Sequence, residues 1–282
     1  MNAIIIGNGS IGRRHFKNLK SLGLYVRAVD IDEIDEIDSI LKNNHFDFGM
    51  VCTPNNLHLE HCLKLAEHGI HFFCEKPFYS EKACNILANI RKLVKEKSLV
   101  NMVGCNLRFH PTIKSFDKSE VSFVKAVFGY DLKKWHNDGK HLESYSANKN
   151  MGGGIMLDAI HEFDYLYNWF GEIEDIEVNC KKIGDVTIDT EDTVDATIKF
   201  KNGVIAAVQL DYLQPKYTRY VEKLVRDWGT EIHNIEPDDD MYIDEIKYFI
   251  DCVRNKRKCM NDIDEAVYLI DKLQNGIITN EL

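Results

Sequence analysis

The segment from Ala3 to Gly12 reads AIIIGNGSIG, an apolar run followed at once by the pattern G-x-G-x-x-G. A continuous apolar run is typical of a strand that is buried on both faces of a parallel sheet. Glycines at this spacing permit a tight turn and let backbone N–H groups approach a pyrophosphate at the start of a helix. The segment therefore predicts the first strand, the turn and the first helix of a dinucleotide-binding sheet.

The rest of the first 110 residues alternates apolar runs with amphipathic stretches. Further strands are expected at residues 24–30, 47–54, 70–77 and 99–106. Helices are expected at residues 11–22 and 31–42, then after the caps Asn55 or Asn56 and Ser80. This βαβαβ order predicts an α/β fold, a Rossmann doubly wound parallel sheet.

The second expected strand ends at Asp30, eighteen residues after Gly12. An acid at this place accepts hydrogen bonds from the ribose hydroxyls, and its charge repels a 2′-phosphate. NAD is therefore favoured over NADP. Arg13 and Arg14 are the alternative phosphate ligands, although a solvent-facing role on the helix is the preferred interpretation.

Three of the expected strands end in polar clusters: TPNNLH (53–58), EKP (75–77) and NLRFHP (106–111). The carboxyl ends of parallel strands meet at one edge of the sheet, where such folds bind ligands. Taken alone, Lys76 and Pro77 have a simpler interpretation as the end of a strand. Three clusters beside a dinucleotide-binding turn instead indicate a ligand site.

The second half of the chain has a different pattern, with alternating apolar and polar residues at 122–131, 175–183, 192–200 and 204–212. The segment Lys201–Gly203 (KNG) predicts a hairpin between the last two of these strands. We expect an α+β domain with an open-faced, mostly antiparallel sheet over residues 119–282, after an NAD-binding domain over residues 1–118. Two helices, at about 242–254 and 263–274, close the chain and are candidates to pack back on the first domain.

A second polar constellation follows the glycines Gly152–Gly154, which allow close approach of a ligand or strand. Asp158, His161 and Asp164 are spaced three apart, so one helix is expected to present all three on one face. Asp164 is expected to hydrogen-bond the His161 imidazole. The alternative is a half-buried helix whose histidine is satisfied within the core.

Bulk properties exclude several classes of function. A net charge of −10 argues against nucleic acid or an anionic membrane as a partner. No apolar run reaches the roughly 20 residues that span a bilayer, and the N-terminus lacks a secretory signal, so a cytoplasmic protein is expected. The eight cysteines form no C-x-x-C pair, which predicts reduced thiols and no metal site.

The motifs G-x-G-x-x-G, T-P-N-x-x-H, E-K-P, N-x-R-x-H-P and G-G-G-x-x-x-D, in this order, resemble the glucose–fructose oxidoreductase / inositol dehydrogenase / MocA (Gfo/Idh/MocA) family. The resemblance covers essentially the whole chain. It implies that Lys76 lies beside the nicotinamide and the substrate hydroxyl, and that Pro77 fixes it, often through a cis peptide. It also implies a homodimer or homotetramer formed through the C-terminal sheet.

The resulting hypothesis is an NAD-dependent oxidoreductase that transfers a hydride between nicotinamide and a secondary hydroxyl or ketone of a sugar, nucleotide sugar or cyclitol. In it Lys76 polarises the reacting oxygen, His161 takes its proton and Asp158 orients the substrate. The predicted cofactor-binding residues are Gly7, Asn8, Gly9, Ser10, Ile11, Gly12, Asp30, Thr53, Pro54, Asn55, Asn56, His58, Glu75 and Lys76. The predicted substrate-binding residues are Arg108, Tyr145, Lys149, Asp158 and His161, with Lys133 as a further candidate.

The segment around Gly152–Gly154 looks most like family members that act in bacterial surface-glycan biosynthesis, which favours an activated or acidic sugar. Two other functions remain open: an NAD-dependent glycoside hydrolase of the same family, and a non-catalytic NAD-binding regulator. Asp158 and His161 are three residues apart in this sequence, whereas many members of the family space them four apart.

Overall fold

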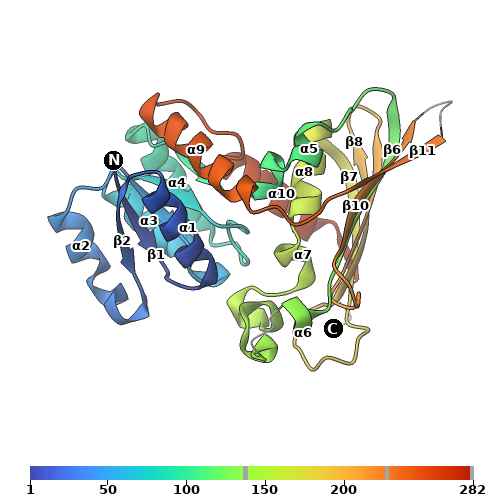
Figure 1. The fold of residues 1–282 in the computed structure, drawn as a ribbon, viewed down its shortest axis with the longest axis horizontal. Helices are drawn as coiled ribbons and strands as arrows, with labels where there is room; N and C mark the ends of the chain where they lie inside the picture. Colours follow the sequence, from blue (N-terminus) through green and yellow to red (C-terminus); the bar gives the residue numbers. More distant parts are fainter. Residues whose placement is uncertain (136–138, 226–228, 280–282) are drawn as a thin grey trace. The chain divides into compact units, whose positions relative to one another are not determined.

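The computed structural model describes residues 1–135, 139–225 and 229–279 of the chain (Figure 1). The chain forms two compact units, and each is built from two separate segments. Unit 1 comprises Met1–Asn106 and Asp239–Val267, and unit 2 comprises Leu107–Asp238 and the residues from Tyr268 onward. The first boundary between the units therefore lies between Asn106 and Leu107, earlier in the sequence than the boundary expected at residue 118.

Unit 1 contains a five-stranded parallel sheet in the order β2-β1-β3-β4-β5. Its strands are β1 (Asn2–Ile6), β2 (Tyr25–Val29), β3 (Phe48–Val51), β4 (His71–Cys74) and β5 (Asn101–Val103). Its helices are α1 (Ser10–Ser21), α2 (Ile37–Asn43), α3 (His58–Glu67), α4 (Cys84–Glu96) and α9 (Asp240–Arg254). The strand order reverses between β1 and β3, which confirms the predicted doubly wound fold and marks where such sheets bind ligands.

Three predicted helix starts in unit 1 differ from the structure. Helix α3 begins at His58 with Leu57 as its N-cap, so neither Asn55 nor Asn56 is the cap. Residues Ile31–Glu36 form a 3-10 helix, and only Ile37–Asn43 are α-helical. The repeat IDEIDE brings isoleucine back every third residue, and a 3-10 helix aligns residues three apart. Helix α4 begins at Cys84 with Ala83 as its N-cap, so Ser80 is not the cap.

The edge strand β5 is fastened to the second segment of unit 1. Asn101 accepts the N–H of Ile263 at 2.9 Å through its side-chain oxygen. The Val103 N–H donates to the Asn261 carbonyl at 2.8 Å, and the Asn261 side chain donates back to the Val103 carbonyl at 2.7 Å. Residues far apart in sequence thus complete this edge of the sheet.

Unit 2 contains a seven-stranded mixed sheet in the order β11-β10-β6-β9-β8-β7-β12. Its strands are β6 (Val121–Gly129), β7 (Ile173–Lys181), β8 (Thr193–Phe200), β9 (Ile205–Asp211), β10 (Thr218–Val225), β11 (Gly229–Asn234) and β12 (Ile277–Thr279). The β6–β9 and β7–β12 pairs are parallel and the others antiparallel. The predicted hairpin joins β8 and β9, with Gly203 at a φ of 89°.

Strict alternation of buried and exposed residues along β8 gives this sheet one covered and one open face. Helices α7 (Ile155–Asp158) and α8 (His161–Phe170) contact the sheet through β6, β8 and β9. The other helices of at least four residues are α5 (Pro111–Lys114), α6 (Leu132–Trp135) and α10 (Ile263–Asn275), the last of which runs across the unit boundary.

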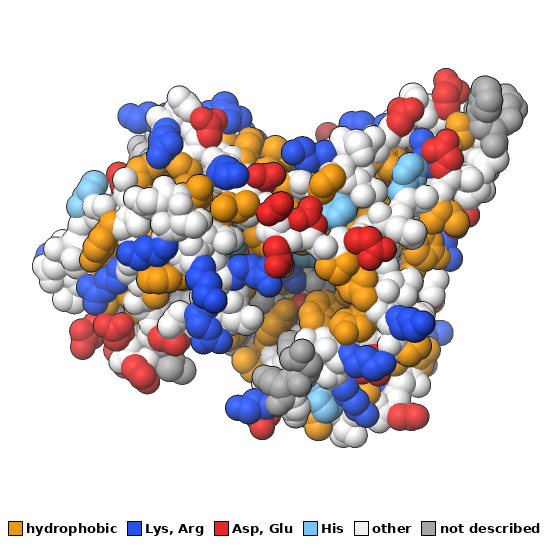
Figure 2. All heavy atoms as spheres, in the orientation of Figure 1, with side chains coloured by type: hydrophobic (Ala, Val, Ile, Leu, Met, Phe, Trp, Pro, Cys, Tyr) orange, Lys and Arg blue, Asp and Glu red, His pale blue; other side chains and the backbone are white. Residues whose placement is uncertain are grey.

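On the face drawn in Figure 2, acidic and basic side chains are interspersed rather than segregated. Within the residues that the structure describes, no helix has both the length and the apolar character that a membrane crossing requires. All eight cysteines lie in described segments, and none of them is part of a disulfide bond there.

Candidate functional site

The glycine turn after β1 is closed on two sides and open on the third. A Cβ on Gly12 would lie 2.0 Å from the Gly7 carbonyl oxygen, and one on Gly7 would lie 2.6 Å from the Cys52 carbonyl oxygen. A Cβ on Gly9 would meet nothing within 4 Å. The turn therefore packs tightly against its own sheet at Gly7 and Gly12. Its open side is at Gly9, beside the first turn of α1, where a pyrophosphate binds in such folds.

The two arginines that follow the turn both have partners within unit 1. Arg13 donates to the Asn8 carbonyl at 2.9 Å. Arg14 forms an ion pair with Asp239, and its guanidinium lies 4.5 Å from the centre of the Tyr242 ring. Each of these arginines therefore has a partner within unit 1.

The predicted cofactor residues gather at the carboxyl edge of the sheet. Asp30 is exposed directly after β2, Thr53 to Asn56 follow β3, and Glu75 and Lys76 follow β4. The Lys76–Pro77 peptide is cis, in agreement with the expectation from the family. Residues that are far apart in the sequence therefore lie at the same edge of the unit 1 sheet.

Glu75 is held by a histidine that the sequence did not single out. The Nε2 atom of His15, on the buried face of α1, lies 2.6 Å from Glu75 Oε1. Burial raises the pKa of the Glu75 carboxyl, but the hydrogen bond and charge of His15 outweigh it and the pKa lies below its usual value. Glu75 is therefore an anion next to Lys76. The sequence does contain a sign of this role, because the spacing of Gly12, His15 and Leu19 places His15 on the buried face of α1.

His58 was predicted to bind the cofactor, but its side chain is buried and has two protein partners. Its Nδ1 lies 2.7 Å from the Pro77 carbonyl oxygen and its Nε2 lies 2.8 Å from the Thr53 carbonyl oxygen. A neutral ring donates to one of these oxygens and a protonated ring to both. Burial lowers the pKa of His58, against the effect of the two carbonyls. Through these contacts His58 connects the segment after β3 to the segment after β4.

In unit 2 the expected single helix after the glycines is broken. Helix α7 ends at Asp158, Ala159 has φ −102° and ψ 34°, and α8 begins at His161. Asp158 and His161 therefore belong to different helices rather than to one helix face. The prediction of one helix is wrong because the backbone leaves helical geometry at Ala159, between Asp158 and His161.

Asp158 is the centre of a hydroxyl cluster. Its carboxylate accepts hydrogen bonds from Tyr145 at 2.5 Å, from Ser146 at 2.6 Å and from Tyr212 at 2.8 Å. Burial and the charge of Asp158 raise the pKa of Tyr212 well above its usual value, so that phenol remains a donor. Three donors match an ionised carboxylate. Ser146 and Tyr212 were not predicted, because only the fold brings β9 to this loop.

The expected pair of Asp164 and His161 is wrong. Both oxygens of Asp164 accept from Arg108, at 2.8 Å each, and the two side chains are 2% exposed. This bidentate pair joins the 3-10 helix Asn106–Phe109 to α8, and it gives Arg108 a buried protein partner. A second buried pair, Glu162 with Arg219 at 2.9 Å, fastens α8 to β10.

Two of the three consecutive glycines are required by close contacts. A Cβ on Gly153 would lie 2.1 Å from the Tyr145 carbonyl oxygen. A Cβ on Gly154 would lie 2.2 Å from the carboxylate of Glu191, and the φ of Gly154 is 109°. The glycines thus let this loop pass between Tyr145 and Glu191 and place α7 beside them. Lys149, the remaining predicted substrate ligand, is exposed on the same loop.

The fold and turn of unit 1 define a dinucleotide-binding oxidoreductase domain, and comparison with known proteins identifies it further. Residues 23–105 match the model "Oxidoreductase family, NAD-binding Rossmann fold", and residues 117–233 match the model "GFO/IDH/MocA C-terminal domain". The chain belongs to the Gfo/Idh/MocA family of oxidoreductases, and its first unit is an NAD-binding Rossmann domain.

Among curated relatives, the chain is 26% identical over 191 residues to the 2,7-anhydro-N-acetylneuraminate hydratase of Escherichia coli, covering 65% of this chain and 50% of that protein. It is 26% identical over 233 residues to the myo-inositol 2-dehydrogenase of Thermotoga maritima, covering 72% and 66%. The chain spans about half the length of the first relatives that it matches.

The fold also matches solved structures. The crystal structure of GenD2 from gentamicin A biosynthesis in complex with NAD has a TM-score of 0.80 and 18% identity, covering 97% of this chain and 92% of that one. The myo-inositol 2-dehydrogenase of Lactobacillus plantarum has a TM-score of 0.77 and 18% identity, covering 98% and 96%. At this identity the likeness establishes the two-unit fold alone.

Proposed function

We propose that this protein is an NAD-dependent oxidoreductase acting on a secondary hydroxyl, or the matching ketone, of a sugar, nucleotide sugar or cyclitol. One arrangement supports it most: Lys76 follows β4 directly at the carboxyl edge of an NAD-binding sheet, next to an ionised Glu75. A regulator that only senses NAD needs no ammonium group at that edge. Relatives described as inositol and levoglucosan dehydrogenases support the sugar-like class of substrate.

When bound, NAD supplies the acceptor or donor of a hydride. The Lys76 ammonium donates a hydrogen bond to the reacting oxygen and so favours negative charge on it. His161 takes the hydroxyl proton during oxidation and returns it during reduction. Asp158, fixed by its three hydroxyl donors, orients the substrate through the Tyr145 phenol, which is half-exposed whereas Tyr212 is buried.

The reaction is tested by incubating the protein and NAD with a panel of cyclitols, hexoses and nucleotide sugars while following NADH. Formation of NADH in proportion to oxidised product is expected for at least one of them. Conversion of a substrate without any net NADH would instead assign a redox-neutral reaction, such as glycoside hydrolysis or the hydration named for a relative. Binding of NAD without conversion of any panel member would favour the regulator.

The identity of the base is tested by comparing His161→Asn with Tyr145→Phe. The loss of the imidazole should lower kcat by at least about tenfold, and the residual rate should rise with pH as hydroxide replaces the base. Tyr145→Phe should act mainly on KM. A His161→Asn enzyme with unchanged kcat between pH 6 and 9 would move the role of base to Tyr145 or Lys76.

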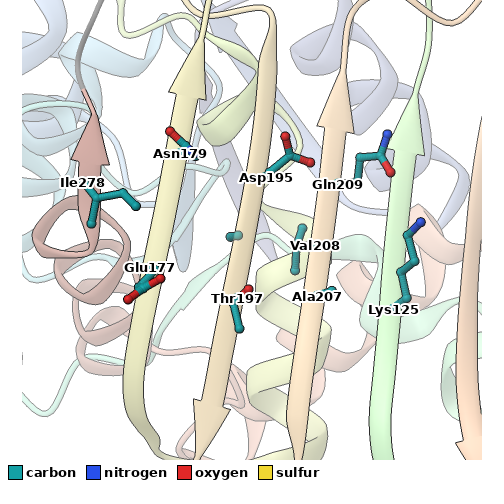
Figure 3. Close-up of a pocket in the computed structure, with 10 residues that line it drawn as sticks. Lys125, Glu177, Asn179, Asp195, Thr197, Ala207, Val208, Gln209 and Ile278 are labelled. Carbon is teal, nitrogen blue, oxygen red and sulfur yellow. The ribbon is translucent and has the colours of Figure 1, made fainter.

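We also propose that the open face of the unit 2 sheet joins two copies of the chain. Leu224, Phe123 and Ile205 are neighbours across β10, β6 and β9, and each is more than a third exposed. Beside them a hollow of about 350 Å³ is lined by polar side chains, including Lys125, Asp195 and Gln209 (Figure 3). Phe123→Glu should reduce the mass measured by light scattering to that of a monomer; an unchanged mass would exclude this face.

We infer that the reaction takes place in the cytoplasm, because eight cysteines outside any disulfide bond suit a reducing compartment. Asp30 supports a preference for NAD over NADP through its charge. A role in surface-glycan biosynthesis would follow if the productive member of the panel is a nucleotide sugar.

A further inference from the structure

The carboxylate of Glu191 lies against the glycine loop of unit 2. Its Oε1 accepts the N–H of Met156 at 3.1 Å, and its backbone carbonyl accepts the N–H of Ile155 at 3.3 Å. Both carboxylate oxygens would lie within 2.4 Å of a Cβ on Gly154. The side chain therefore occupies the space that Gly154 leaves empty, and it holds the first residues of α7.

Helix α7 connects Glu191 to the hydroxyl cluster. It begins at Ile155, next to Glu191, and ends three residues later at Asp158, which accepts hydrogen bonds from the hydroxyls of Tyr145, Ser146 and Tyr212. A shift of the first turn of so short a helix moves its last residue as well. Glu191 is thus linked mechanically to the carboxylate assigned to the substrate.

The charges around Glu191 come from every element packed against it. Burial raises the pKa of Glu191 to about 7, the charge of Asp158 adds to this rise, and the ammonium of Lys149 opposes it. On β7, burial and the charge of Glu191 raise the pKa of Cys180 to about 12, and Tyr212 likewise stays protonated. Lys149 is exposed, and within the described residues its ammonium forms no ion pair. The ionised carboxylate of Glu191 attracts this ammonium.

We propose that Glu191 is a positioning residue for substrate binding, which holds the start of α7 and the ammonium of Lys149 and thereby keeps Lys149 and Asp158 in their substrate-binding arrangement. The inference rests on the proposed function, in which both residues contact a hydroxylated substrate. The ionised form of Glu191 is the organising form, because a carboxylate accepts a stronger hydrogen bond from Met156 than a neutral carboxyl does and attracts Lys149.

The first test measures kcat and KM between pH 6 and 8.5 with the panel substrate that produces NADH. In the unmodified protein KM should fall by about tenfold as the pH rises through 7, the scale of one hydrogen bond to a charged group. Glu191→Gln should keep the high KM at every pH, with kcat changed less than KM. The matched control Glu172→Gln, at an exposed residue paired with Lys201, should follow the unmodified protein. A Glu191→Gln protein with the unmodified pH profile would overturn the inference.

The second test needs no turnover, so it separates this inference from the proposed function. Because the folded-state pKa lies above the usual value, ionisation is disfavoured in the folded protein, and this contribution weakens stability as the pH rises from 4.5 towards 7. Glu191→Gln should therefore melt at a higher temperature than the unmodified protein at pH 8 and at the same temperature at pH 4. Equal melting temperatures at both pH values would refute it, whatever the panel shows.

Variants that leave Glu191 in place test the assigned neighbours. The titration of the Glu191 carboxyl is followed by NMR on ¹³C-labelled protein, with Glu191→Gln to assign the signal. Lys149→Met removes an attracting cation and should move the midpoint to higher pH, whereas Asp158→Asn removes a repelling anion and should move it to lower pH. Midpoints that do not respond to either change would remove Lys149 and Asp158 from the proposed arrangement.

Discussion

The candidate cofactor residues of unit 1 and the candidate substrate residues of unit 2 are held in place in different ways. At the cofactor edge of unit 1, the groups come from short segments that directly follow strands, and the glycine turn is shaped by contacts among backbone atoms. On the substrate side of unit 2, Asp158 is surrounded by hydroxyls from a loop and from the end of β9. A site made of strand ends is local in sequence, whereas a site made of a hydroxyl cluster depends on the tertiary fold.

This difference predicts how substitutions behave on each side. Apart from Glu75 and His58, whose side chains hold neighbouring segments, a side chain at the cofactor edge should be removable with little loss of stability, because the backbone carries the local structure there. On the substrate side, function and stability should fall together, because the same hydrogen bonds serve both.

The largest effect is expected at Lys76. Lys76→Met should lower kcat by roughly a hundredfold or more, the scale of one acid–base contribution. The affinity for NAD by calorimetry and the melting temperature should change little, because β4 and Pro77 remain. If the variant lost NAD affinity as strongly as turnover, the contrast between the residues of unit 1 and those of unit 2 would not hold. If it turned over normally, Lys76 would only mark the end of a strand.

A smaller effect, on stability, is expected from Tyr212→Phe. The change removes a buried hydrogen bond to a carboxylate, which costs about 2 kcal/mol of unfolding free energy in denaturant titrations. Tyr145→Phe should cost less, because Tyr145 is half-exposed and water replaces its hydroxyl at Asp158. Equal losses in the two variants would mean that burial does not distinguish these donors.

The smallest effect is expected at Asp30. The unmodified protein should bind NAD at least about tenfold more tightly than NADP, a difference of about 1.4 kcal/mol. Asp30→Ala should reduce this ratio by weakening NAD and admitting the 2′-phosphate, without a change in melting temperature. Equal affinities in the unmodified protein would instead assign Arg13 or Arg14 to the phosphate, despite their partners in the fold.

What could and could not be predicted from the sequence divides in the same way between unit 1 and unit 2. The five parallel strands, the glycine turn and the placement of Glu75 and Lys76 follow from apolar runs and the residues that end them. The strand β10 was missed because Arg219 and Lys223 occupy positions that are largely shielded by partners: Arg219 pairs with Glu162, and Lys223 pairs with Glu231. Their charges hide the alternation from which a strand is recognised.

The errors at the site have a related cause. A spacing of three residues between Asp158, His161 and Asp164 fits one helix, and no pattern in the sequence marks the break at Ala159. The partner of Asp164 lies on a segment that precedes it by more than fifty residues, and the partners of His58 are backbone carbonyls. Residue type indicated that these side chains were important, but only the fold determines which atoms they meet.

The fastening of β5 by residues 261–263 has a consequence for the order in which the protein is made. A chain emerging from the ribosome presents all five strands of unit 1 early, yet the bonds that complete their edge arrive only after the whole of β6 to β11 has been synthesised. The NAD-binding unit, first in the sequence, is therefore finished only after most of unit 2 is available to fold. Until then the backbone groups at the open edge of β5 have no partner from this segment. The nascent chain is therefore most prone to incorrect strand pairing during that interval.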